Sequence, residues 1–127
     1  MAAATLSPEQ TPERLCTLSA DARTAVLLDA AGALAGSTEP NRARAEELAG
    51  LARELFEAVD SAASDEPAEQ VEAQVPGGAV FASRTPRWTL AVVARRQALS
   101  SLMLYDLRAV LAELEGGPPI VTREAAT

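Results

Sequence analysis

WTLAVVAR, the stretch from Trp88 to Arg95, decides the fold of this chain. Five of the six residues between the tryptophan and the arginine are apolar. Thr89, Val92 and Val93 are β-branched and favour an extended backbone, and the run is too short for a helix of ordinary length. A strand with one wet face would alternate apolar and polar residues, which this run does not. It therefore predicts the central strand of a sheet that helices cover on both faces.

A second apolar run, TAVLLD from Thr24 to Asp29, predicts a second buried strand beside the first. The tight turn that follows ends in Gly32, which can adopt the positive φ that such a hairpin needs. The chain then returns as a strand over Ala33–Thr38, and Gly36 weakens that strand.

Residues 42–63 carry the longest helical periodicity, and Asn41 is placed to cap their start. The core-facing row of this helix is predicted to contain Leu48, Ala52, Leu55, Phe56 and Val59. Leu51, Ala58 and Ala62 form a second apolar row, and Gly50 lies beside it at a cost of about 1 kcal/mol relative to alanine. A helix over one sheet face needs only one row. The second row therefore predicts contact with another backbone, and a wide core face is the alternative.

A meander of three strands follows the long helix. Val71–Val75 alternates apolar residues with Glu72 and Gln74, which is typical of a strand with one wet face. Pro76, Gly77 and Gly78 then favour a hairpin, and the next strands are Ala79–Arg84 and the opening stretch.

The two densest apolar strands are expected at the centre of the sheet, with Ala33–Thr38 and Val71–Val75 at its edges. The second of these edges has no neighbour in sequence that would cover it. Its backbone N–H and C=O groups are therefore expected to be open to pairing with another chain.

Short helices complete the domain, and the first of them follows an N-terminal tail. Residues 1–10 are expected to be disordered. Ser7 or Thr11, each followed by proline, is expected to begin a helix that ends near Leu18.

The last predicted helix runs to about Glu115, with Ser100 or Ser101 as its cap. Glycines and prolines end it, and residues 116–127 are expected to be a second disordered tail. The folded domain is thus expected to occupy residues 11–115.

The composition excludes most catalytic chemistry. The chain has no histidine and all of its basic residues are arginine, so it has no imidazole base, no lysine Schiff base and no phosphate loop of the GxxxxGK[ST] type. Carboxylates occur at Glu46 and Glu47 and between Asp65 and Glu72, where solvated charge is the simpler explanation. We expect no enzyme activity, no cofactor and no metal.

Cys16 is alone, so no internal disulfide can form, and a reducing compartment is the natural expectation. No apolar run approaches the roughly 20 residues that span a bilayer, and the first residues lack the pattern of a secretory signal. We expect a cytoplasmic protein that does not enter a membrane.

The net charge of −7 is unevenly distributed. Acids dominate between Glu39 and Glu72, whereas arginines dominate between residues 84 and 108. An acidic chain whose arginines do not alternate with aromatic residues is a poor nucleic-acid binder, and we expect no nucleic acid to bind. Four arginines are candidate contacts for an acidic protein partner: Arg84, Arg87, Arg95 and Arg96.

The succession of elements resembles the Roadblock family, named for a dynein light chain and including bacterial regulators of Ras-like GTPases. Four segments carry the resemblance: AVLLDAAGALAGST from Ala25, RARAEELAGLARELFEAVDSA from Arg42, RWTLAVVAR from Arg87, and LSSLMLYDLRAVLAEL from Leu99. The resemblance implies a mixed α/β fold, of the α+β class because its sheet is antiparallel. Its five-stranded antiparallel sheet would have the order 2-1-5-4-3, the long helix on one face and the first and last helices on the other.

The resemblance also implies a homodimer that joins the third strand and the long helix of two subunits. Carried onto this chain, the dimer contact would comprise Gly50, Leu51, Leu55, Ala58, Ala62, Val71, Ala73 and Val75. The function expected is a non-catalytic regulator or scaffold of a small Ras-like GTPase in bacterial signalling. A dimerising adaptor without effect on a GTPase and a small-ligand sensory domain are the alternatives.

Overall fold

The computed structural model describes residues 6–62 and 67–117. In chain order the elements are α1 (Thr11–Leu18), β1 (Ala22–Asp29), β2 (Leu34–Ser37), α2 (Arg42–Ala62), β3 (Gln70–Val75), β4 (Gly78–Arg84), β5 (Trp88–Ala94) and α3 (Ser100–Leu114). The strands form one antiparallel sheet in the order β2-β1-β5-β4-β3. The predicted fold class and strand order are confirmed.

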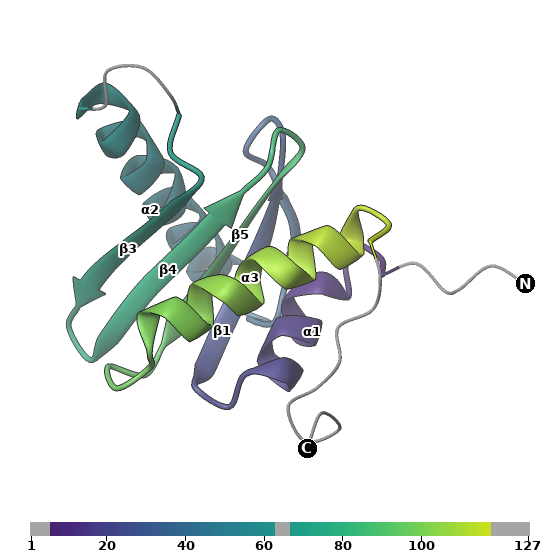
Figure 1. Ribbon diagram of the computed structural model, residues 1–127, viewed down its shortest axis with the longest axis horizontal. Helices are drawn as coiled ribbons and strands as arrows, with labels where there is room; N and C mark the ends of the chain where they lie inside the picture. Colours follow the sequence, from purple (N-terminus) through teal and green to yellow (C-terminus); the bar gives the residue numbers. More distant parts are fainter. Residues whose placement is uncertain (1–5, 63–66, 118–127) are drawn as a thin grey trace, which may run out of the picture.

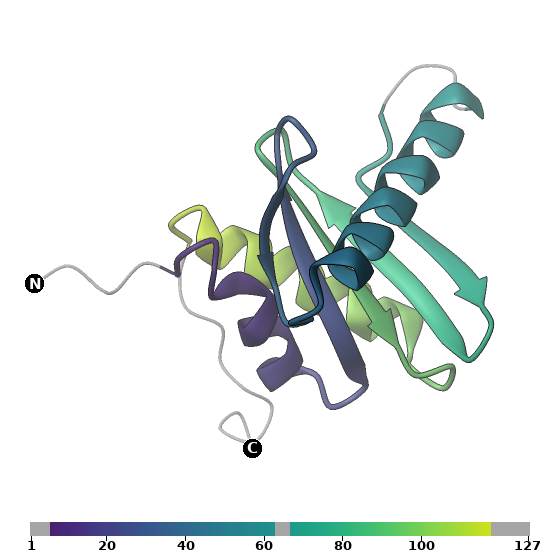
Figure 2. The ribbon, with the colours of Figure 1, turned by 180° about the vertical axis from the view of Figure 1, so that it is seen from behind.

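The sheet lies between two helical layers. Helix α2 crosses one face alone, and α1 and α3 lie side by side on the other (Figures 1 and 2). A half-buried ion pair between Arg14 and Glu113 joins α1 to α3, with 3.3 Å between Nε and Oε1. The predicted layers are therefore present.

Both central strands are covered on both faces, as their sequences predict. Val26 and Leu28 of β1 contact the α2 layer, and Leu27 faces α1 and α3. Leu90 and Val92 of β5 face the same layer as Leu27, and all five side chains are at most 1% exposed. Because neither face of these strands meets water, their sequences do not need to alternate apolar and polar residues.

The two hairpins follow the predicted turn chemistry. Gly32 has φ of +85°, and the Asp29 carboxylate accepts the N–H groups of Ala31 and Ala33 at 2.9 Å. Gly77 adopts the same φ between β3 and β4.

Gly36 of β2 has a packing role that the sequence alone did not reveal. A Cβ at this position would lie 2.6 Å from the carbonyl oxygen of Pro8. Its missing side chain lets residues 8–9 cross β2 just before α1 begins, so the glycine that weakens the strand also allows this approach. Residues 7–10 form a hydrogen-bonded turn there.

The helix starts were predicted with mixed success. Asn41 caps α2, because its Oδ1 accepts the N–H of Arg44 at 3.2 Å. The cap predicted for α3 is wrong: Leu99 occupies the cap position, no side chain caps the helix, and Ser100 instead donates its hydroxyl to Glu72 at 2.7 Å.

Val59 is a second correction. It was predicted to face the core, but it is 38% exposed. The C-terminal end of α2 extends past the sheet (Figure 2), so the strands cover the last turns of this helix less than its middle. The loop predicted to end this helix and the outer parts of both predicted tails lie outside the described residues, at 63–66, 1–5 and 118–127.

Candidate interaction surface

Strand β3 is an open edge of the described sheet, since it pairs only with β4. The N–H of Arg84 donates to the carbonyl of Glu69 at 2.8 Å, which sets the phase of this ladder. Backbone groups of successive residues in a strand point to opposite sides. The N–H and C=O groups of Gln70, Glu72 and Gln74 therefore point away from β4, toward the open side.

The apolar side chains of this strand lie on the α2 face. Val71 is buried there, Val75 packs partly against the same cluster, and Ala73 is half-buried between them. The open edge thus combines free backbone groups with a partly covered apolar face.

A row of apolar residues on α2 flanks this edge. Leu51 and Leu55 are half-buried, whereas Ala58 and Ala62 are exposed. On the opposite flank of the helix, Arg53 donates to the carbonyl of Gly32 in the β1–β2 hairpin at 2.6 Å. The Leu51 row therefore faces the other way, toward β3.

Gly50 does not share this row. At about 100° per residue, it lies nearer to Glu54 and Glu57 on the outer face of α2. The nearest atom to a Cβ built on Gly50 is Nη2 of Arg53, at 3.7 Å. Within the described chain, no backbone makes the close approach that the sequence suggested for this glycine.

Arg84 holds the C-terminal half of α2 on the sheet. Its Nη2 lies 2.6 and 2.8 Å from the two carboxylate oxygens of Asp60, and its Nε donates to the carbonyl of Ala68 at 2.7 Å. Its guanidinium also lies over the Phe56 ring, 4.2 Å from the centroid. These contacts favour a structural role for Arg84 over one in partner contact.

The same contacts act on the titration of Asp60. The hydrogen bond from Arg84 lowers the pKa of this carboxyl below its ordinary value, and the N–H of Ala68, which donates at 3.2 Å, lowers it further.

The other three candidate arginines are exposed but lie at two ends of the sheet. Arg87 precedes β5, whereas Arg95 and Arg96 follow it. The strand between them has seven residues, and at about 3.3 Å each they separate the two ends by roughly 20 Å. The candidate arginines therefore lie at two separate sites and do not form one basic patch.

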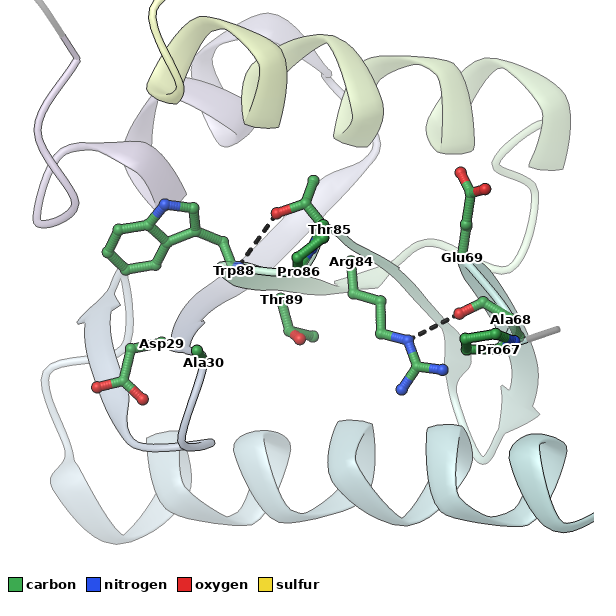
Figure 3. A pocket seen from close by; sticks show the side chains of 10 residues that line it. All are labelled: Asp29, Ala30, Pro67, Ala68, Glu69, Arg84, Thr85, Pro86, Trp88 and Thr89. Atoms are coloured by element: carbon green, nitrogen blue, oxygen red, sulfur yellow. Dashed lines mark hydrogen bonds between the residues drawn. The ribbon is translucent and has the colours of Figure 1, made fainter.

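An open cleft of about 840 Å³ lies at the Arg87 end of the sheet, where the ends of β1 and β4 and the start of β5 meet residues 67–69 (Figure 3). Asp29, Thr85 and Trp88 line it together with Arg84. Two of its polar side chains have partners within the chain: the Thr85 hydroxyl accepts the backbone N–H of Trp88, and the Asp29 carboxylate caps its own turn. This is the cleft that a ligand-sensing role would use, and two of its polar side chains are already bound by other groups of the chain.

The described residues contain no group of three or more metal-ligating side chains that could hold an ion. None of the helices in that part of the chain has the length and apolar character to cross a membrane.

Neither a scan against protein-family models nor a search of curated proteins finds a match. Solved structures do match. A Roadblock/LC7 domain from Streptomyces avermitilis superposes with a TM-score of 0.74 at 22% identity, over 86% of this chain and 95% of that one. The chain has the Roadblock/LC7 fold. This confirms the fold that the sequence resemblance implied.

Two further structures show how widely this fold is shared. MglB from Myxococcus xanthus has a TM-score of 0.64 at 15% identity, over 84% of this chain and 83% of that one. A profilin in a complex described as LokiProfilin2 with rabbit actin has a TM-score of 0.61 at 14% identity, over 82% and 92%. Because the same fold occurs in proteins of different types, the fold alone does not determine the partner.

Sequence reasoning missed four exposed apolar side chains: Val59, Leu99, Leu102 and Tyr105. The last three share a spacing of three residues and lie off the core-facing row of α3. That spacing was the available signal.

Proposed function

We propose that the chain is a non-catalytic homodimer that regulates or scaffolds a small Ras-like GTPase in a bacterial signalling system. The observation that carries the proposal is the open β3 edge flanked by the apolar row of α2. Every second residue of β3 points its backbone N–H and C=O groups toward the open side. Two copies related by a two-fold axis could therefore pair their β3 strands through these groups and form one continuous sheet. The GTPase role rests on the Roadblock resemblance.

The proposed contact comprises Leu51, Leu55, Ala58 and Ala62 of α2 and Val71, Ala73 and Val75 of β3. Val59 extends it, because the end of α2 reaches past its own sheet. Gly50, which the resemblance also implies, lies on the outer face and is left out. In a two-fold contact each residue acts twice, so completing the burial of one leucine removes two leucine side chains from water.

The experiment is a change of charge within the row. Leu51→Arg with Ala58→Arg would bury four unpaired guanidinium groups per dimer, which a contact cannot tolerate. The expected product is a folded monomer by light scattering. The matched control is Glu54→Arg with Glu57→Arg, on the outer face of the same helix, which should remain dimeric. A double variant of unchanged mass would contradict the contact.

The regulatory role needs a separate assay. Single-turnover GTP hydrolysis and nucleotide exchange by small GTPases from the same source should change when the dimer is added. The monomeric variant should lose the effect. If the dimer forms and binds a GTPase but leaves hydrolysis and exchange unchanged, the scaffold role is favoured. If it binds none, the adaptor alternative replaces the proposal.

A further inference from the structure

The start of α3 carries an exposed apolar row. Leu99 is 67% exposed, Leu102 37% and Tyr105 64%. Residues three apart lie next to each other on a helix. The opposite side of α3 is filled by its buried row, which includes Met103 and Leu107. No described element covers the outer row, so it is open to solvent.

Two arginines precede this row closely in the chain. Arg95 and Arg96 are exposed and precede it by one turn, which the bond from the Ala98 N–H to the Arg95 carbonyl closes at 3.0 Å. Arg23 is at the same end of the sheet, because β1 begins where β5 ends. Among the described residues, no ion pair involves any of these arginines.

Two acidic residues lie at the same end of the sheet as these arginines. The backbone carbonyl of Asp21 accepts the Arg95 N–H, and the Glu72 carboxylate accepts the Ser100 hydroxyl. Three arginines against these two acids leave this end positive, on a chain whose net charge is −7. The uncapped start of α3 adds partial positive charge.

We infer that this surface, defined by Arg95, Arg96, Leu99, Leu102 and Tyr105, docks an acidic segment of a partner protein that carries apolar side chains. Carboxylates of the segment would meet the arginines while its apolar side chains cover the row on α3. The inference goes beyond the proposed dimer, since α3 lies on the opposite sheet face from α2 (Figure 1). The inference rests on the proposed function in one respect: it takes the chain to be a scaffold, and it names the class of protein that this scaffold would bind.

Two other occupants fit less well. A second copy of the chain, bound through this same surface, would bring arginines against arginines. A flat anionic membrane would repel a chain of net negative charge. A narrow acidic segment avoids both conflicts.

The test is fluorescence anisotropy with the full chain and a labelled synthetic peptide of glutamate, leucine and phenylalanine. Saturable binding that weakens as salt is raised is expected. Arg95→Glu with Arg96→Glu, and separately Leu102→Gln with Tyr105→Ser, should each weaken binding at least about tenfold. The matched control is Arg87→Glu, at the other end of the sheet, which should bind as the wild type does.

Several results would overturn the inference. One is the absence of saturable binding, and another is equal affinity for a peptide with glutamine in place of glutamate. Retained affinity in both double variants would also overturn it. Binding to phosphatidylglycerol vesicles that depends on Tyr105 would assign the surface to membranes, and a mass above the dimer that depends on Tyr105 would assign it to another copy. Mass and GTP hydrolysis measured on the same variants distinguish a failure here from a failure of the proposed dimer.

Discussion

Replacing Gly50 by alanine tests which face of α2 is used for self-association. Alanine is favoured over glycine by about 0.8–1.0 kcal/mol in a helix interior. The new Cβ would have Nη2 of Arg53 as its nearest neighbour, at 3.7 Å, which is an ordinary van der Waals contact. With no clash to offset the gain, the free energy of unfolding should rise by about 1 kcal/mol per chain, or roughly 4 °C in Tm.

The assay is urea unfolding followed by circular dichroism at several chain concentrations, with the mass measured in parallel. Leu55→Ala is the matched comparison, because it removes apolar surface from the row that faces β3. Gly50→Ala should raise the midpoint without changing the dimer mass, whereas Leu55→Ala should weaken dimerisation. If Gly50→Ala dissociates the dimer or lowers stability, another backbone approaches Gly50, and the proposed orientation of the two α2 helices is refuted.

Three further predictions follow from single contacts. Asp60→Asn should lower the free energy of unfolding at pH 7, because Arg84 depresses the pKa of this carboxyl in the folded chain. The stabilisation is present above the unfolded pKa near 3.9 and is lost as the pH falls through the lower folded pKa. In urea unfolding, the difference between wild type and variant should therefore vanish in strong acid, and an equal difference at pH 7 and in strong acid would contradict this prediction. Gly36→Ala should destabilise by about 1–3 kcal/mol, since the added Cβ would lie 2.6 Å from the Pro8 carbonyl oxygen; an unchanged urea midpoint would mean that residues 8–9 do not cross β2. Burial raises the pKa of the Cys16 thiol, so a disulfide reagent should label it slowly in the native protein and rapidly in urea, and fast native labelling would show that it is accessible.

The core of this fold could be predicted because its strands leave little choice. The runs at 24–29 and 88–95 are apolar on both faces, and only central strands between helices satisfy both faces at once. The strand order and the division of the helices between the two faces followed from the same patterns and the family resemblance.

The errors concern relations between elements that are distant in sequence. Val59 has the correct helical phase, but the point at which α2 leaves the sheet depends on the crossing angle. Arg84 is 24 residues from Asp60, so its structural role could not be read from local pattern. The apparent cluster of arginines in the sequence is divided in space by the full length of β5.

The central claim is that two copies complete the β3 edge, and the mass of the wild-type chain in solution tests it most directly. Sedimentation equilibrium at micromolar concentration should give twice the chain mass of 13.2 kDa. A mass of 13.2 kDa that stays constant as the concentration is raised would contradict the account.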